Sequence, residues 1–433
     1  MSLKPYFSEK YYQRSHKALT TALDSVPAYR SWRIIDPGNG RSIDERYSAL
    51  PEFTKHDIRE HFPHGLVPDN RDIAKGLEQG EIEYVETSGT TSEKVTNVWH
   101  QEWWDKCEAS SWKLNIHTSH LNHNHREAQL ASSLSVGFRS DNDIAMESRI
   151  LNNRLLFLNE KTSPQQWNSY HFNRMIIELN KFKPAILEVN PSYLARFAWW
   201  AIDNNAKVYL PEVILFTYEL PSVTQLASIS RIFPVPFASS YGTTETGYVF
   251  MQCEHGIFHQ NTDFCRVDFE PLKDKHGGPD LGRILVTIFN NKWTSLLRFD
   301  VGDLVRLSDN GFCACGRNEG LIVSAIEGRV ANATFTTSGR LVTNKEVDDI
   351  FLTVNGIRDY KVEQNSLTQY NVKIVSNCDK NTAEKDTMKI MQSLYGINAE
   401  VKIIHCADIE PEASGKYRRT KINFTFDEKE LFA

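Results

Sequence analysis

Residues 213–245 have the sequence VILFTYELPSVTQLASISRIFPVPFASSYGTTE, in which a strand, a helix and a second strand follow one another. Val213 to Phe216 is a short apolar run of the kind that forms a buried strand. The segment from Val223 to Phe233 carries apolar residues at helical spacing, and Val235 to Ser239 predicts the next strand. This order predicts a β/α-wound sheet and therefore an α/β fold.

The same alternation begins upstream of this stretch. Ala185 to Val189 predicts a strand, Asn190-Pro191 ends it, and a helix is expected near Ser192 to Ile202. In wound sheets of this kind, ligands bind beyond the carboxyl ends of the strands. The polar residues that follow Ser239 stand at such an end, so they are candidates for a binding site.

Those polar residues form the motif Tyr241-Gly242-Thr243-Thr244-Glu245. A tyrosine ring can stack on a purine, a threonine hydroxyl can reach a phosphate, and a carboxylate can hold the Mg²⁺ that accompanies ATP. The alternative is an ordinary turn, in which a threonine caps the backbone and the glutamate is solvated. The position at a strand end favours the nucleotide site.

A second polar loop comes earlier in the chain, between two short alternating stretches, Ile82 to Glu86 and Val95 to Trp99. It is expected to close a hairpin, whereas a Walker phosphate loop leads from Gly-Lys-Ser/Thr into a helix. Its backbone N–H groups and hydroxyls could hold phosphates, and Lys94 could add a charge. A solvated turn is the alternative. The members of the loop are Thr87, Ser88, Gly89, Thr90 and Thr91.

Near the end of the chain, Ser414-Gly415-Lys416-Tyr417-Arg418-Arg419 is a third polar segment. A lysine beside two arginines in such a place is commonly part of a solvated tail. An ammonium group in a water-poor cleft can instead stabilise the negative charge that accumulates when a carboxylate attacks the α-phosphorus of ATP. The three loops, in this order, predict an enzyme that uses ATP to activate a carboxylic acid.

The chain resembles the adenylate-forming superfamily of acyl-CoA synthetases, and most of all its phenylacetate-CoA ligase branch. Leu50 to Glu60 and His64 to Pro68 are similar to the N-terminal segment of that branch. Leu296 to Leu304 resembles the family stretch that binds ribose, and Ile326 to Arg329 resembles the segment before the interdomain hinge. Lys416 matches the mobile catalytic lysine. The similarity covers nearly the whole chain.

The resemblance implies a role in phosphate chemistry for several residues. Residues 87–91 would hold the β- and γ-phosphates of ATP, and Thr244 would contact the α-phosphate. Glu245 would bind Mg²⁺. Lys416 would bridge the carboxylate of the substrate and the α-phosphate while the bond between them forms.

The resemblance also implies which residues bind the nucleoside. Tyr241 would stack on adenine, and Gly242 and Thr243 belong to the same nucleotide-binding motif. Asp303 would bind the ribose hydroxyls. Arg329 would lie near the ribose or a phosphate.

The sequence departs from the family pattern at a few positions. Ser92 and Lys94 replace the usual Gly and Pro, and Phe299-Asp300-Val301 stands where Tyr-Arg-Thr is more usual. Arg329 is followed by Val330-Ala331-Asn332 instead of an early acidic residue, which leaves open how, or whether, the small domain swings from the adenylating to the thioester-forming pose. Adenylation is the step that the sequence predicts most directly.

The leading hypothesis is AMP-forming activation of a small-molecule carboxylic acid, aromatic by resemblance, followed by transfer to the thiol of CoA. Residues 112–140 and 216–219 are expected to supply the acid pocket. The acyl acceptor could instead be the phosphopantetheine of a carrier protein, an amine or a protein cysteine. From a different class, a degenerate nucleotide- or acid-binding module without turnover is the alternative, although Glu245 and Lys416 argue against it.

Two domains are expected, a large N-terminal adenylation domain of β/α subdomains (residues 1–328) and a small C-terminal α+β lid (residues 329–433). The boundary follows a strand predicted at Leu321 to Ile326. The lysine loop is expected after the last strand of the lid, where closure of the lid would deliver it. The lid pattern predicts strands at 360–363, 371–375 and 401–405 and a helix at 383–395.

The cysteines point to a metal site. Cys253 and His259 form one close pair, and Cys313 and Cys315 form a second pair in a glycine-flanked turn. Three thiolates and one imidazole suit tetrahedral zinc, and a site closed by four protein ligands is structural. The alternative is two buried cysteines and an unrelated turn. Disulfides are not expected in a reducing compartment.

Length and charge set further limits. The chain has 433 residues, 40% of them hydrophobic, and a net charge of −6, so nothing points to nucleic acid or an anionic membrane as a partner. Its apolar runs are far shorter than the roughly 20 residues of a membrane-spanning helix. We therefore expect a cytoplasmic protein, with a homodimer left open.

Overall fold

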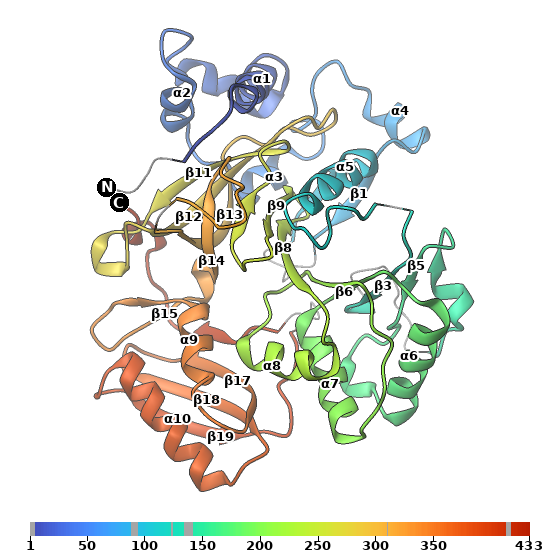
Figure 1. The fold of residues 1–433 in the computed structure, drawn as a ribbon. Helices are drawn as coiled ribbons and strands as arrows, with labels where there is room; N and C mark the ends of the chain where they lie inside the picture. Colours follow the sequence, from blue (N-terminus) through green and yellow to red (C-terminus); the bar gives the residue numbers. More distant parts are fainter. Residues whose placement is uncertain (1–4, 88–93, 123, 134–141, 310, 413–416) are drawn as a thin grey trace. The chain divides into compact units, whose positions relative to one another are not determined.

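The computed structural model of the protein describes residues 5–87, 94–122, 124–133, 142–309, 311–412 and 417–433 (Figure 1). The chain forms two compact units. The first consists of residues 1–120, 240–271 and 280–325, and the second of residues 121–239, 272–279 and 326–433. No helix within the described ranges is long and apolar enough to cross a membrane.

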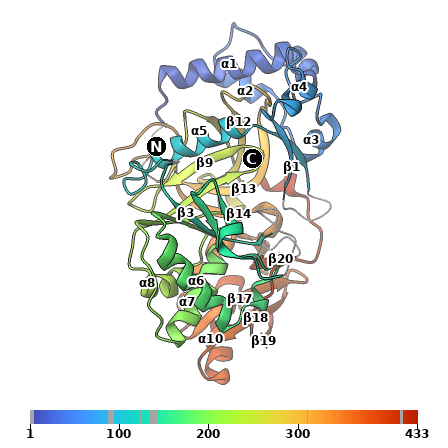
Figure 2. The same ribbon diagram turned by 90° about the vertical axis from the view of Figure 1, so that its right-hand side faces the viewer.

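Helices form the N-terminal part of the first unit. Helix α1 (Glu9–Ser25) begins where the Ser8 hydroxyl accepts a hydrogen bond from the backbone N–H of Tyr11, and it ends ahead of Pro27. Helices α1 and α2 lie together next to strand β12 (Figure 2). The remaining α-helices described in this unit are α2 (Ile43–Ala49), α3 (Lys55–His61), α4 (Ile73–Glu78) and α5 (Gln101–Trp112).

Antiparallel strands form the rest of the first unit. The hairpin predicted around residues 87–91 is confirmed, because β1 (Glu83–Glu86) pairs antiparallel with β2 (Thr96–Trp99). The larger sheet has the order β11-β12-β13-β14-β10-β9-β8 in this unit. Its strands are β9 (Gly247–Gln252), β10 (Phe258–Gln260), β11 (Cys265–Pro271), β12 (Leu281–Ile288), β13 (Phe299–Leu307) and β14 (Ile322–Arg329).

Two strands are longer than the sequence pattern indicates. Strand β8 covers Phe237–Thr243, so Tyr241, Gly242 and Thr243 belong to a strand and not to a loop after it, which corrects the prediction. The reason is the antiparallel ladder with β9, in which Tyr241 lies opposite Phe250. Strand β14 similarly extends through Gly328 to Arg329.

The wound sheet predicted around residues 185–245 is confirmed in the second unit. Strands β8, β7, β6, β3 and β5 are neighbours in that order and pair in parallel, with β4 antiparallel at the edge. The strands are β3 (Glu127–Leu130), β4 (Ile150–Leu151), β5 (Leu155–Phe157), β6 (Ile186–Val189) and β7 (Val213–Phe216). The helices are α6 (Ser169–Phe182), α7 (Pro191–Asp203) and α8 (Val223–Ile232).

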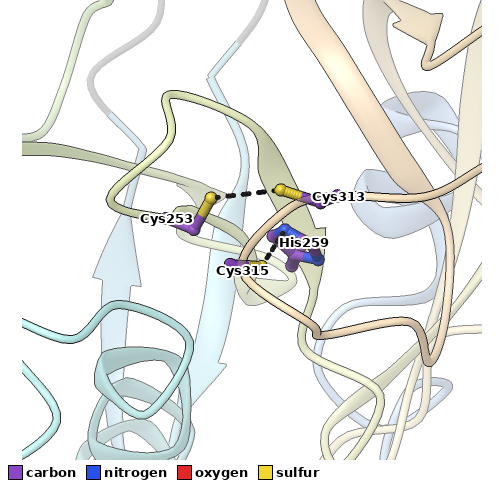
Figure 3. A group of neighbouring side chains, drawn as sticks. All are labelled: Cys253, His259, Cys313 and Cys315. Atoms are coloured by element: carbon purple, nitrogen blue, oxygen red, sulfur yellow. Dashed lines mark hydrogen bonds between the residues drawn. The ribbon is translucent and has the colours of Figure 1, made fainter.

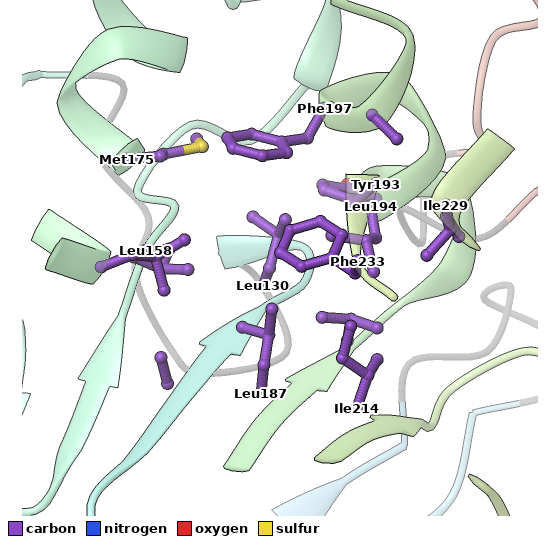
Figure 4. Packing of buried hydrophobic residues seen from close by; sticks show 14 of the residues in the cluster. Leu130, Leu158, Met175, Leu187, Tyr193, Leu194, Phe197, Ile214, Ile229 and Phe233 are labelled. Carbon is purple, nitrogen blue, oxygen red and sulfur yellow. The ribbon is translucent and has the colours of Figure 1, made fainter. Parts of the chain in front are cut away.

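One face of this parallel sheet forms the core with the helices (Figure 4). Leu187 and Val189 of β6 point to the same face, because alternate residues of a strand do so, and they belong to one buried cluster with side chains such as Phe197 of α7. Burial of each large apolar side chain stabilises the unit by about 1.5–3 kcal/mol. The opposite face carries polar residues, among them Glu127, Gln129 and Glu188.

The C-terminal part of the second unit is α+β, as predicted, with its own core of residues between Val342 and Ala399. Its four-stranded sheet has the order β19-β18-β17-β20. Strand β20 (Thr420–Ile422) pairs parallel with β17, so a strand follows residues 415–416, which corrects the expectation that the lysine loop comes after the last strand. The other elements are β15 (Thr334–Phe335), β16 (Leu341–Val342), α9 (Asn344–Phe351), β17 (Ile357–Gln364), β18 (Gln369–Ser376), α10 (Lys380–Tyr395) and β19 (Glu400–His405).

Candidate functional site

The motif at residues 241–245 lies at the end of β8 and in the turn to β9. A side chain at position 242 has no room, because a Cβ atom there would stand 2.2 Å from the carbonyl oxygen of Gly247. The turn is held by Thr243, whose Oγ1 accepts a hydrogen bond from the backbone N–H of Thr246 at 3.2 Å. Glycine is therefore required where the two strands cross closely.

Tyr241 and Asp303, predicted for adenine and ribose, are in direct contact. The Tyr241 hydroxyl donates a hydrogen bond to Asp303 Oδ2 at 2.8 Å, and both side chains are largely buried. Asp303 comes from β13, which is 62 residues away in sequence. The fold therefore joins an aromatic ring and a carboxylate, groups that can bind a nucleoside through stacking and through hydrogen bonds to ribose hydroxyls.

Glu245, predicted as the magnesium ligand, has an unsatisfied carboxylate. Its side chain is only 3% exposed, and its Oε1 accepts no hydrogen bond from any residue in the described ranges. A buried carboxylate oxygen without a hydrogen bond is costly, and a carboxylate oxygen is the ligand type that Mg²⁺ prefers. The residue therefore fits a cation site.

Lys55 is a residue that the sequence interpretation missed. Its Nζ lies 3.9 Å from Glu245 Oε1, and the lysine is the first residue of α3. A signal was present in the sequence, because Thr54 and Asp57 form a capping box that fixes where this helix starts. No sequence pattern, however, predicts that the helix start faces residue 245.

Helix α3 also contacts the hairpin of the predicted phosphate loop. Arg59 Nη1 donates a hydrogen bond to the backbone oxygen of Lys94 at 3.4 Å. At the neck of the hairpin, Thr87 Oγ1 accepts a hydrogen bond from the N–H of Val95 at 3.1 Å. Ser88, Gly89, Thr90 and Thr91 lie outside the described residues.

Three further predicted site residues are Thr244, Arg329 and Lys416. Thr244 lies in the turn beside Glu245 and is half-buried. Arg329 ends β14 in the second unit, whereas Glu245 is in the first. Lys416 lies outside the described residues.

The residues expected to line an acid pocket differ in burial, and some of them lie outside the described residues. Trp112 is buried at the end of α5, and Phe216 belongs to the core of the parallel sheet. Residues 134–141 lie outside the described residues. Glu219 is half-buried in the loop after β7 and has several polar contacts.

The four predicted zinc ligands converge in the first unit (Figure 3). Cys253 Sγ and Cys313 Sγ are 3.7 Å apart, and Cys315 Sγ is 3.3 Å from His259 Nε2. One ligand atom from each residue lies within 4.8 Å of all the others. This donor set and these spacings fit a tetrahedral zinc ion with bonds of about 2.0–2.3 Å.

The surroundings of this cluster keep the imidazole ready to bind a metal. Burial lowers the pKa of His259 to about 4, so the ring is neutral at physiological pH. Burial raises the pKa of Cys313 to about 12, and a bound zinc ion would reverse this by deprotonating the thiol. Beside the cluster, Arg317 Nη1 donates a hydrogen bond to each carboxylate oxygen of Glu254, at 3.0 Å to Oε1 and 3.1 Å to Oε2.

Comparison with known proteins identifies the fold class. Solved structures of acid-CoA ligases are similar to nearly the whole chain, so the fold is that of the adenylate-forming acyl-CoA synthetases, and the predicted resemblance is confirmed at this level. The α/β class with a small C-terminal α+β part is also confirmed.

Particular relatives are distant in sequence. A 2-hydroxyisobutyryl-CoA ligase in complex with its acyl-adenylate is 14% identical with a TM-score of 0.68, covering 98% of this chain and 92% of the ligase. An anthranilate-CoA ligase in complex with anthranoyl-AMP is 12% identical with a TM-score of 0.52, covering 78% of this chain and 65% of that one. Protein CapK of Staphylococcus aureus is 23% identical over 391 residues, covering 86% of this chain and 79% of CapK. Residues 334–423 match the model of the CapK C-terminal domain.

Proposed function

We propose that the protein catalyses ATP-dependent, AMP-forming activation of a carboxylic acid to an acyl-adenylate and then transfers the acyl group to the thiol of CoA. The observation that carries the proposal is the buried hydrogen bond between Tyr241 and Asp303, and it is supported by the buried Glu245 carboxylate oxygen four residues further along the chain from Tyr241. The fold supports it, since similar structures include acid-CoA ligases in complex with acyl-adenylates, and structures of the 2-hydroxyisobutyryl-CoA ligase also contain CoA.

The nucleoside is bound by residues of β8 and β13. The Tyr241 ring stacks on adenine, and the absence of a side chain at Gly242 lets the strand approach the nucleotide. Asp303 accepts hydrogen bonds from the ribose hydroxyls. Thr243, at the end of β8, belongs to the same nucleotide site. Arg329 adds a guanidinium toward the ribose or a phosphate.

The phosphates are bound by residues 87–91, the loop of the β1–β2 hairpin, and Thr244 contacts the α-phosphate. Glu245 holds the Mg²⁺ of MgATP, which neutralises charge on the phosphates. Lys55 adds a second cation next to Glu245 and helps to balance the triphosphate charge.

Lys416 supplies the charge that the reaction itself develops. The substrate carboxylate attacks the α-phosphorus and pyrophosphate leaves, and the ammonium group of Lys416 stabilises the negative charge on the attacking and phosphoryl oxygens. The lysine belongs to a lid formed by residues 329–433, while residues 1–328 form the adenylation domain. A lid that closes over the site would exclude water from the mixed anhydride.

The substrate class and the acceptor are narrower parts of the proposal. The acid is aromatic, in line with the resemblance to phenylacetate-CoA ligases, and the acceptor is CoA. A carrier-protein phosphopantetheine, an amine or a protein cysteine as acceptor, and a binding module without turnover, are the competing outcomes. The structural relatives take both an aromatic acid and a hydroxylated aliphatic acid, so the test includes both kinds.

The experiment is pyrophosphate release with MgATP across aromatic, hydroxylated and short aliphatic acids, with and without CoA. Acid-dependent release that rises with CoA and falls at least about 100-fold in Lys416→Ala is the expected result. A product that forms only with a carrier protein overturns CoA as the acceptor. ATP binding without release for any acid overturns the enzymatic function.

We also propose that Cys253, His259, Cys313 and Cys315 hold a structural zinc ion that joins the β9–β10 hairpin to the turn before β14. A bound ion would stabilise this part of the first unit because it cross-links segments that are far apart in sequence. Elemental analysis of protein purified without chelator is expected to give about one zinc per chain, and Cys315→Ser is expected to lose it. Zinc well below one equivalent in the wild type overturns the assignment.

A further inference from the structure

Cys253 and Cys313 begin two turns of the same kind in the first unit. The third residue after each cysteine is a glycine whose backbone N–H donates to the cysteine carbonyl oxygen, at 2.9 Å from Gly256 and 3.0 Å from Gly316. Both glycines have a left-handed backbone, with φ of +78° and +79°, which glycine adopts without strain. The backbone of each cysteine is therefore fixed by its own turn.

The two turns bring the sulfur atoms of these cysteines together. Cys253 Sγ and Cys313 Sγ are 3.7 Å apart across 60 residues of sequence, and both side chains are buried (Figure 3). The backbone N–H of His255 also donates to Cys253 Sγ at 3.4 Å. Cys315 Sγ lies instead 3.3 Å from His259 Nε2. The cluster therefore consists of one pair of sulfurs and one pair of a sulfur and an imidazole.

The separation of the sulfur pair allows either a shared metal ion or a covalent bond. Two sulfurs on one tetrahedral zinc ion are roughly 3.8 Å apart, because each Zn–S bond is about 2.3 Å long. A disulfide bond is only about 2.0 Å long. From the observed separation of 3.7 Å, the sulfurs would have to approach by about 1.7 Å to form one. Metal binding and disulfide formation by this pair therefore exclude each other.

We propose that Cys253 and Cys313 form a reversible disulfide when zinc is absent, so that the cluster is also a site of oxidative modification. The inference uses residues of the proposed zinc site, but formation of the disulfide does not require zinc. The turn at Cys313 lies at the surface, since Phe312 is 61% exposed and Cys315 is half-buried. A small oxidant such as hydrogen peroxide therefore has a short path to the sulfur pair.

The reaction transfers two electrons from the sulfur pair to the peroxide. One thiolate attacks a peroxide oxygen, the O–O bond breaks, and a sulfenic acid and hydroxide form. The second thiolate then attacks the sulfenic sulfur, so the S–S bond forms and a second hydroxide leaves. The two protons released by the thiols convert the hydroxides into two water molecules. A dithiol reductant reverses the bond by thiol–disulfide exchange.

The direct test is peptide mapping of wild-type protein that has been stripped of metal with a chelator and treated with hydrogen peroxide. A linked pair of peptides containing Cys253 and Cys313 is expected, and dithiothreitol is expected to separate them. The number of free thiols in the unfolded protein is expected to fall from seven to five, because one disulfide consumes two. Oxidation to sulfinic acid without this linked pair overturns the inference.

The relation to the metal is tested by loading the protein with zinc before the oxidant is added. The linked pair is expected to form at least about 10-fold more slowly, because the lone pairs of both sulfurs are then engaged by the metal. Zinc is expected to be released in step with the disulfide. Equal rates with and without bound zinc overturn the exclusion. If elemental analysis finds no zinc in the wild type, the zinc proposal is wrong, while the peptide map of the metal-free protein still decides the disulfide.

Cysteine variants show whether the bond is specific to this pair. Cys253→Ser and Cys313→Ser are each expected to abolish the linked peptides, whereas Cys315→Ser keeps both sulfurs of the pair and is expected to retain them. Cys378→Ser is the matched control, because Cys378 is a half-buried thiol of the second unit whose Sγ donates to the carbonyl oxygen of Asn355 at 3.5 Å. It is expected to change neither the disulfide nor the zinc content. Loss of the linked peptides in Cys315→Ser or in this control overturns the assignment.

Discussion

The turns after β8 and β7 each place a glutamate in or near the protein interior, but the two glutamates differ in what satisfies them. Glu219 after β7 has a protein donor on each carboxylate oxygen. Glu245 after β8 keeps one buried oxygen without a hydrogen bond among the described residues and has a lysine at 3.9 Å. A satisfied carboxylate organises the chain around it, whereas an unsatisfied one fits a cation that is not part of the chain.

The largest expected effect is that of removing the charge of Glu245, the carboxylate with the unsatisfied oxygen. Glu245→Gln is expected to lower acid-dependent pyrophosphate release by about 100-fold or more, because a neutral amide is a poor ligand for Mg²⁺. The melting temperature is expected to stay equal or rise, since a buried charge without a hydrogen bond is removed. Glu78→Gln, at an exposed position at the end of α4, is the control for rate and stability. A marked fall in melting temperature would show that Glu245 is structural.

A third buried carboxylate, Glu188 on β6, sharpens the comparison through pH. Thr217 and Gln129 donate to its Oε1 at 2.8 and 3.2 Å. Burial and then the nearby Glu127 raise the pKa of Glu188 to about 8. Because its pKa is raised, Glu188 keeps a proton in the folded state that it releases in the unfolded state. Its contribution to the free energy of unfolding is therefore fully present below about pH 4.5 and is lost as the pH rises toward 8.

The variant that tests this titration is Glu188→Gln, which stays neutral at every pH. Its free energy of unfolding relative to wild type is expected to rise by at least about 1 kcal/mol between pH 5 and pH 8.5. Urea unfolding at the two pH values measures the difference. If the free energy of unfolding of Glu188→Gln relative to wild type is the same at both pH values, Glu188 does not carry a proton in the folded state.

The pairing of Glu245 with Lys55 gives a smaller effect on stability. Lys55→Met is expected to lower the free energy of unfolding by about 1 kcal/mol, since it leaves the buried carboxylate without its cation and the lysine is itself partly exposed. In a Glu245→Gln background the same substitution is expected to have no effect, because the charge that it balanced is gone. Equal losses in both backgrounds, measured by urea unfolding, would contradict the pairing.

The last comparison concerns Asp303, whose carboxylate accepts a hydrogen bond from Tyr241, and the expected effects on stability and on ATP binding are both modest. Tyr241→Phe keeps the ring but removes the hydrogen bond to Asp303, and it is expected to cost about 1 kcal/mol of stability. The KM for ATP is expected to rise only about two- to five-fold, because stacking on adenine is retained. Tyr241→Ala, which also loses the ring, should raise it further. A phenylalanine variant as weak as the alanine variant would assign the binding to the hydroxyl.

Local patterns in the sequence predicted much of the fold. The run from Val213 to Phe216 and the helical spacing from Val223 onward gave a strand and a helix with nearly the observed ends. Strand β20 was missed because Thr420–Ile422 is too short to show an alternating pattern. The extension of β8 through Thr243 was missed because the ladder with β9, and not local propensity, decides where that strand ends.

The sequence alone determined the kinds of chemical group available: an aromatic ring, carboxylates, hydroxyls and thiols in motifs whose spacing is set by neighbouring residues. Only the tertiary structure decided which of them meet. It joined Tyr241 to Asp303, faced Lys55 toward Glu245 and attached Tyr417 to Glu219. The physical reason is that these contacts span tens to hundreds of residues, so they depend on how strands and helices pack, which no local pattern records.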